Sequence, residues 1–137
     1  TPDQSAFLDE RCRATKNRQL FDLAAQALGR RGHFDKSIEL FTMALDQDPN
    51  AVNTRLSLVV TLHLAGRYAD EIPHLRVLIN TLPADVQVLR FAIQAGTWGG
   101  ATDLADRGMA LLKQHHPKLA PLAERFRNTP PPPPQGR

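Results

Sequence analysis

The sequence has little of what marks a redox, metal-binding or membrane protein. Its 137 residues include one cysteine, Cys12, so no disulfide can form within the chain and no cysteine-based zinc site is available. One cysteine establishes neither an oxidising nor a reducing compartment. No apolar run approaches the roughly 18 residues of a membrane span, and the first residues lack the basic and apolar pattern of a signal segment. We therefore expect no membrane span.

Concentrated charge and catalytic motifs are missing as well. The 17 Lys and Arg and 14 Asp and Glu residues are interspersed, whereas a nucleic-acid partner needs a concentrated basic face, so we expect no nucleic acid. Adjacent His115 and His116 would face different directions on a helix, and His63 and His74 have no further ligand at zinc-type spacing. No Gly-rich phosphate loop, nucleophile elbow or paired-carboxylate motif is present. The sequence predicts no enzyme, catalytic residue, cofactor or metal.

What the sequence does contain is a spacing that recurs. Glycine and proline both recur with a period of 34 positions. The glycines are Gly32, Gly66 and Gly100 (66 − 32), and the prolines are Pro49, Pro83 and Pro117 (83 − 49). In the first period the apolar residues recur at helical spacing, as Phe21, Ala24, Ala25 and Leu28 and then as Phe34, Ile38, Phe41, Ala44 and Leu45. A glycine ends the first helix, and the second stops before a proline, which disfavours helical geometry in the preceding residue. Such a period indicates stacked helix-turn-helix units.

This unit resembles the tetratricopeptide repeat (TPR), and the resemblance covers residues 18–119. The aromatic, leucine, glycine-or-alanine, small and proline positions of the family correspond here to Phe21, Ala24, Ala25, Ser37 and Pro49. The resemblance implies an all-α fold, a right-handed superhelix of three TPR helix-turn-helix repeats with flanking capping helices. The expected parts are an N-terminal capping helix at 1–17, repeats at 18–51, 52–85 and 86–119, a C-terminal capping helix at 118–127 and a proline-rich disordered tail at 128–137.

The second and third repeats depart from the family pattern. Arg55 replaces a large apolar residue and Glu71 replaces a small one. Because an unpaired buried charge is unfavourable, we interpret both as pointing partly outward, with a buried functional pair as the alternative. Pro73 is expected in the first turn of its helix, where a missing N–H is tolerated. Gly96 replaces a large residue, and we expect its repeat to be the least stable.

The resemblance also implies a concave groove, lined by the first helix of each repeat, that binds a peptide or helix of a partner. The corresponding positions are Gln19, Asp22, Gln26, Arg30, Asn53, Leu56, Val60, His63, Gln87, Arg90, Gln94 and Thr97. A carboxamide both donates and accepts, so the recurring amides could bond a peptide main chain, while Leu56 and Val60 add an apolar patch. The alternative is that these surface positions are simply polar. Trp98 is a candidate hot spot, with burial in the core as its other interpretation.

These features predict a non-catalytic protein-interaction module, an adaptor or chaperone-like subunit of a bacterial assembly such as a secretion, pilus or envelope system. The alternative is an accessory TPR domain of a larger enzyme or regulator. The chain begins at Thr1 rather than Met, so we expect a processed product or an excised domain.

The tail and the ends of the stack leave further options open. Five consecutive prolines, Pro130 to Pro134, predict extended polyproline II. This segment serves as a linker, as a ligand for an SH3-like, WW-like or profilin-like partner, or as a segment that folds into a neighbouring molecule's groove. A homodimer would form through the end helices, at Phe7, Leu8, Leu122 and Phe126.

Overall fold

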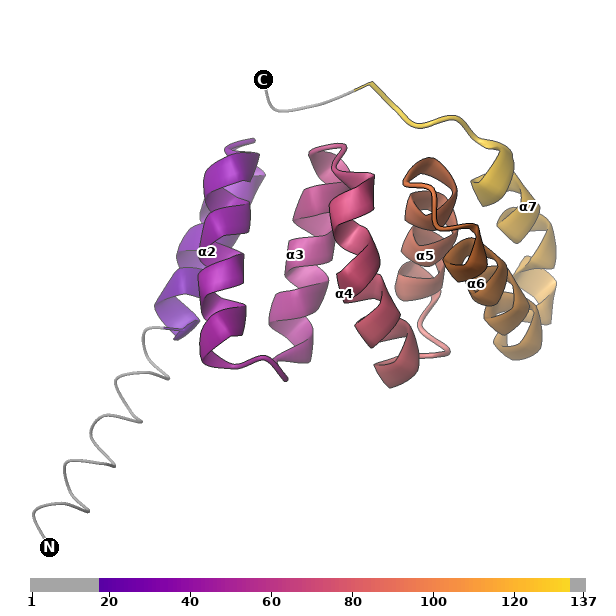
Figure 1. Ribbon diagram of the computed structural model, residues 1–137, viewed down its shortest axis with the longest axis horizontal. Coiled ribbons are helices and arrows are strands. Elements are labelled where there is room, and N and C mark those ends of the chain that lie inside the picture. Colours follow the sequence, from indigo (N-terminus) through magenta and orange to yellow (C-terminus); the bar gives the residue numbers. More distant parts are fainter. Residues whose placement is uncertain (1–17, 134–137) are drawn as a thin grey trace, which may run out of the picture. The chain divides into compact units, whose positions relative to one another are not determined.

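A computed structural model describes residues 18–133, and all of its regular structure is helical (Figure 1). Residues 18–30 form a helix. The elements that follow are α2 (Phe34–Gln47), α3 (Val52–Leu64), α4 (Tyr68–Thr81), α5 (Val86–Trp98), α6 (Thr102–His115), the 3-10 turn η1 (Pro117–Leu119) and α7 (Ala120–Asn128). No strand occurs between residues 18 and 133, so the predicted all-α class is confirmed. The N-terminal helix predicted at 1–17 lies outside the described residues.

The chain divides into two compact units, Thr1–Thr61 (unit 1) and Leu62–Arg137 (unit 2). Unit 1 contains the helix at 18–30, α2 and most of α3, and unit 2 contains α4 to α7. The boundary falls inside α3, near its C-terminal end. In the part of the chain that the structure describes, no helix combines the length and the apolar character that crossing a bilayer would require.

The helices keep the period that the glycines and prolines mark. The second helices of successive pairs, α2, α4 and α6, begin 34 residues apart, at Phe34, Tyr68 and Thr102 (68 − 34 and 102 − 68). Each pair turns through a glycine with positive φ, and the three angles are 81° at Gly32, 74° at Gly66 and 86° at Gly100. Nothing lies within 4 Å of the place where a Cβ would stand on any of them. Glycine is needed for the left-handed backbone and not for space.

The helix at 18–30 packs on α2 through small residues. Ala25 and Ser37 are both 0% exposed, and the Ser37 hydroxyl donates to the Ala25 carbonyl at 2.6 Å. Phe41 and Ala44 of α2 complete this buried surface. Ala24, which we placed on the same apolar stripe, is exposed. The stripe is therefore narrower than its sequence pattern predicts, because the alanine beside the contact faces away from it.

In unit 2, α5 packs against α4, α6 and α7. Its buried side chains include Val88, Leu89, Phe91, Ala92 and Ile93. The neighbouring helices α4 and α6 also bury large side chains, namely Leu75, Leu78, Ile79, Leu104 and Leu112. A Cβ on Gly96 would lie 2.8 Å from both the Ala101 carbonyl oxygen and the Ala105 nitrogen. Gly96 therefore allows the backbones of α5 and α6 to approach closely.

The position of Pro73 corrects one prediction. Because α4 begins at Tyr68, Pro73 is its sixth residue and lies inside the helix, beyond the first turn. It supplies no N–H for the carbonyl of Ala69, four residues earlier. Both residues are exposed, so water can reach this part of the helix.

Candidate functional site

The most unusual contact in unit 2 joins a histidine to a fully buried carboxyl group. His63 lies in the last turn of α3 and Glu71 in the first turn of α4, on either side of the turn at Gly66. The Nδ1 atom of His63 is 2.9 Å from Oε2 of Glu71 and 3.1 Å from Oε1, so the two side chains share a hydrogen bond. The Glu71 side chain is 0% exposed and that of His63 is 15% exposed.

Burial controls the protonation of Glu71. Removal from water disfavours its charged form and raises the pKa of the carboxyl from 4.5 to about 7, while the hydrogen bond and the charge of His63 act in the opposite direction. The pKa of Tyr68 is also raised, first by burial and then by the nearby Glu71 charge. The carboxyl group therefore changes its protonation state close to neutral pH.

Aromatic rings surround the histidine. We call His63, Tyr68, Phe91 and Trp98 the aromatic cluster. The His63 ring centroid lies 4.4 Å from that of Phe91, 5.3 Å from Tyr68 and 5.7 Å from Trp98. Tyr68 and Trp98 meet edge to face at 4.8 Å. These rings come from the end of α3, from α4 and from α5, so the cluster joins these three elements within unit 2.

Trp98 also contacts the segment after the last helix. It is half-buried, and its indole Nε1–H donates to the carbonyl oxygen of Thr129 at 2.9 Å. Trp98 ends α5, and Thr129 directly follows α7. The residue is thus part core and part surface, between the two interpretations that its sequence position allowed.

The His63–Glu71 pair can take up and release a proton, and its hydrogen bond joins the end of α3 to the start of α4. A histidine held by a carboxylate is also part of a nucleophilic triad, which requires a hydroxyl or thiol at the other ring nitrogen. Within residues 18–133 no such group hydrogen-bonds to His63. Nor does any group of three or more His, Cys, Asp or Glu side chains converge there in a way that could hold a metal ion.

The structure corrects the interpretation of Glu71. We expected Glu71 and Arg55 to point partly outward, and this is wrong for Glu71, which is entirely enclosed. Its partner is His63, whereas Arg55 is only half-buried and donates to the Pro49 carbonyl at 2.9 Å. The useful signal was a histidine at the end of one helix and a carboxyl early in the next, separated by a short glycine turn.

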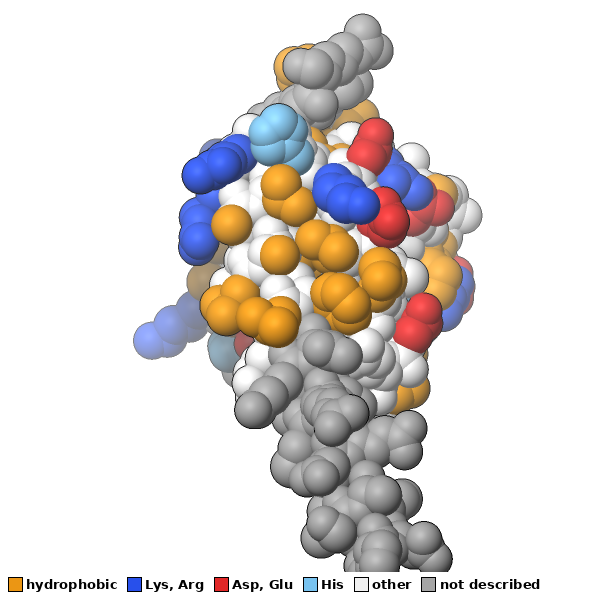
Figure 2. Space-filling model, turned by 90° about the vertical axis from the view of Figure 1, so that its left-hand side faces the viewer, with side chains coloured by type: hydrophobic (Ala, Val, Ile, Leu, Met, Phe, Trp, Pro, Cys, Tyr) orange, Lys and Arg blue, Asp and Glu red, His pale blue; other side chains and the backbone are white. Residues whose placement is uncertain are grey.

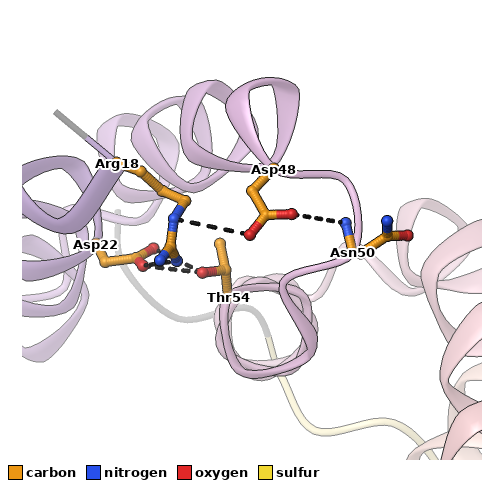
Figure 3. A network of polar contacts seen from close by, with 5 residues as sticks. All are labelled: Arg18, Asp22, Asp48, Asn50 and Thr54. Carbon is orange, nitrogen blue, oxygen red and sulfur yellow. Dashed lines mark hydrogen bonds and ion pairs between the residues drawn. The ribbon is translucent and has the colours of Figure 1, made fainter. Parts of the chain in front are cut away.

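Among the predicted groove positions of unit 1, Asp22 forms hydrogen bonds and an ion pair with neighbouring side chains of the same unit. Its carboxylate accepts from the Thr54 hydroxyl at 2.8 and 3.1 Å and lies 3.5 Å from the Arg18 guanidinium. Arg18 also approaches Asp48 at 3.9 Å, and Asp48 accepts from the Asn50 N–H (Figure 3). This network joins the helix at 18–30 to α3, so the Asp22 carboxylate serves helix packing.

The remaining positions of unit 1 are accessible to different degrees. Gln19, Gln26, Arg30 and Asn53 are exposed, whereas the predicted apolar patch at Leu56 and Val60 is half-buried.

In unit 2 the predicted positions lie along one face of α5. Gln87, Arg90, Gln94 and Thr97 follow a spacing of three and four residues, which keeps their side chains on one side of a helix. Gln87 and Thr97 are exposed, and Gln94 and Arg90 are half-buried. The Arg90 guanidinium carbon lies 4.9 Å from the centre of the neighbouring Phe91 ring. The predicted groove residue His63 is held in the aromatic cluster.

Comparisons with known proteins give one partial relative. No protein-family profile matches the chain, and no solved structure matches it. A stretch of 91 residues is 30% identical to ALBINO3-like protein 3, mitochondrial, from Arabidopsis thaliana. The match covers 64% of this chain and 16% of that protein. The chain therefore resembles a small part of a much longer protein.

Proposed function

We propose that the chain is a non-catalytic protein-binding module of the tetratricopeptide type, which holds a peptide or helix of a partner with the first helix of each pair. The observation that carries this proposal is a set of exposed amides in one register. Gln19, Asn53 and Gln87 follow each other at the 34-residue period (53 − 19 and 87 − 53), and all three are exposed. Gln26 and Gln94 repeat at twice that period (94 − 26).

These amides have unused hydrogen-bonding capacity. Within residues 18–133 no hydrogen bond engages any of the five side chains, in contrast to Asp22 and His63. A carboxamide donates and accepts, as a peptide group does, so it can pair with the main chain of an extended ligand without regard to that ligand's sequence. Repetition along successive helices suits a ligand that itself repeats, such as a peptide backbone.

Two settings fit such a module. One is an adaptor or chaperone-like subunit of a bacterial secretion, pilus or envelope assembly. The other is an accessory domain within a larger protein, and the comparison with ALBINO3-like protein 3 favours it because the chain spans 16% of that protein. In this second setting the module recruits a partner to the activity of the longer chain.

The test compares two pairs of glutamines. Gln26→Ala with Gln94→Ala changes the first helices, and Gln47→Ala with Gln114→Ala changes exposed glutamines of α2 and α6 as a matched control. Partners are captured from a lysate on the immobilised chain and identified, and their affinity is then measured with purified components. We expect the first pair to weaken binding about tenfold, as two lost hydrogen bonds would, and the control pair to bind as the unchanged chain does. Equal affinities for all three proteins would refute the proposal.

A further inference from the structure

The contact between Trp98 and Thr129 fixes the start of the proline-rich tail. The Thr129 N–H and hydroxyl both donate to the Arg125 carbonyl, at 3.0 and 2.5 Å, which ties this residue to the end of α7. Its own carbonyl then accepts from the Trp98 indole at 2.9 Å. Three hydrogen bonds thus determine where the tail leaves unit 2 and in which direction its first carbonyl points.

The backbone at this point already has the geometry of polyproline II. Thr129 has φ −78° and ψ 128°, close to the values of about −75° and +145° for that helix. A residue before proline is restricted to such extended conformations, and Pro130 follows directly. Pro130 to Pro133 are exposed and form no other regular structure. The carbonyl that Trp98 binds is therefore the first of a polyproline segment.

The side of unit 2 that holds this carbonyl has the chemistry that recognises polyproline II. Such segments have no N–H groups to offer at proline, so they are recognised through their carbonyls and through the flat faces of aromatic side chains. The Trp98 indole supplies a donor and cannot accept. Tyr68 meets Trp98 edge to face at 4.8 Å, and both rings are half-exposed.

We propose that Trp98 and Tyr68 form a docking site for a polyproline II segment, and that the chain's own tail, from Thr129 to Pro133, occupies it. This site lies where α5 ends and differs from the exposed amides of the proposed function. The tail thereby covers part of Trp98 through the Thr129 carbonyl, while Pro130 to Pro133 keep exposed surface. The Trp98 contact is what links tail docking to the aromatic cluster of unit 2.

The first test uses Trp98 as its own reporter, since it is the only tryptophan of the chain. In a full-length tail variant, Pro130 to Pro134 are replaced by alternating Gly and Ser, which keeps Thr129 and the chain length. We expect the emission of Trp98 to shift to longer wavelength and its quenching by acrylamide to increase. Unchanged emission and quenching would overturn the proposal, because Trp98 would then contact only the end of α7.

The second test supplies the segment from outside. A labelled peptide of one threonine and five prolines is titrated into the tail variant and into the unchanged chain, with an alanine peptide as the control. We expect the proline peptide to bind the tail variant and to bind the unchanged chain at least about fivefold more weakly. In the tail variant, Trp98→Phe should lower the affinity for the peptide about fivefold, because it removes one hydrogen bond. Equal binding to the tail variant with and without Trp98→Phe would overturn the site.

Two further outcomes would each overturn occupation by the chain's own tail. One is equal affinity of the peptide for the tail variant and the unchanged chain. The other is a dimer of the unchanged chain that the tail variant does not form, which would place the tail on a second copy. Capture of partners through Gln26 and Gln94 does not involve the tail, so failure here leaves the proposed function standing, and the reverse also holds.

Discussion

A carboxyl group that is shut off from water either gives up its charge or is stabilised by a partner. Both effects act on Glu71, because burial favours its neutral form and His63 favours its charged form. Its side chain is 0% exposed, and its pKa rises to about 7 even though His63 lies 2.9 Å away and favours the charged form. Desolvation is therefore the larger effect. A purely apolar side chain at this place would leave the His63 Nδ1 without its partner, which is itself unfavourable.

This balance predicts how stability depends on pH. The folded protein holds a proton on Glu71 between about pH 4.5 and 7, an interval in which the unfolded chain has released it. The folded state is thus the one with more bound protons, and its stability falls as the pH rises through this window, by on the order of 3 kcal/mol. We expect Glu71→Gln, which has no such proton, to gain stability relative to the unchanged protein over the same window.

Urea unfolding of both proteins at about pH 5 and about pH 8 measures this difference. Glu39→Gln, at an exposed carboxyl of α2, is the control and should follow the unchanged protein. Parallel pH profiles for the Glu71→Gln variant and the unchanged protein would show that Glu71 keeps one protonation state.

The sequence could not have disclosed this pair by its repeat pattern alone. Glu71 occupies a position where the TPR family has a small residue. Because an unpaired buried charge is unfavourable, the repeat pattern predicts that its side chain points outward. What decides its place is His63, eight residues earlier, and the two meet only because the Gly66 turn brings one helix end onto the next. Trp98 was ambiguous for a similar reason, since its partner Thr129 is 31 residues away.

At the scale of a helix, α4 contains a proline, Pro73, that destabilises it. Pro73 lies inside the helix and removes one main-chain hydrogen bond, and its ring crowds the carbonyl of Ala69. Because Pro73 is exposed, its replacement sacrifices little packing. We expect Pro73→Ala to raise the free energy of unfolding by about 1 to 3 kcal/mol, measured by thermal and urea unfolding.

Pro121 offers the matched control. It stands in the first turn of α7, where a missing N–H is harmless, so Pro121→Ala should leave stability unchanged or slightly lower. A loss of stability in the Pro73→Ala variant would contradict this and would mean that the proline stabilises the native backbone of α4.

The order and spacing of the helices were predictable because their determinants are local. Gly32, Gly66 and Gly100 each reverse the chain through a positive φ, a property of one residue, and the apolar period between them follows from helix geometry. The error at Pro73 arose at a boundary: the turn at Gly66 is short, so α4 begins early enough to include the proline. The close approach at Gly96 involves backbone atoms of another helix and has no local signal.

At the scale of the whole molecule, unit 1 leaves large apolar side chains uncovered. Leu20 is 61% exposed, Leu23 64% and Met43 40%, and Figure 2 shows hydrophobic side chains gathered on the face that the helix at 18–30 and α2 present. Of the residues that we predicted for a dimer interface, Leu122 and Phe126 are half-buried, and Phe7 and Leu8 lie outside the described residues. The two most exposed large apolar side chains, Leu20 and Leu23, therefore lie on unit 1, while Leu64, Val77 and Val86 of unit 2 are exposed to a smaller degree.

This surface predicts where two copies would meet. We expect the unchanged chain to self-associate at high concentration and the Leu20→Gln, Leu23→Gln double variant to do so at least about tenfold more weakly, since burial of a leucine contributes about 2 kcal/mol. Sedimentation velocity over a range of concentrations measures both. The matched control is Leu64→Gln with Val77→Gln, two side chains that are each 45% exposed, in α3 and α4. Equally strong association of the Leu20→Gln, Leu23→Gln variant and the control variant would show that the contact between two copies does not include Leu20 and Leu23. These two side chains would then be available to contact a different protein.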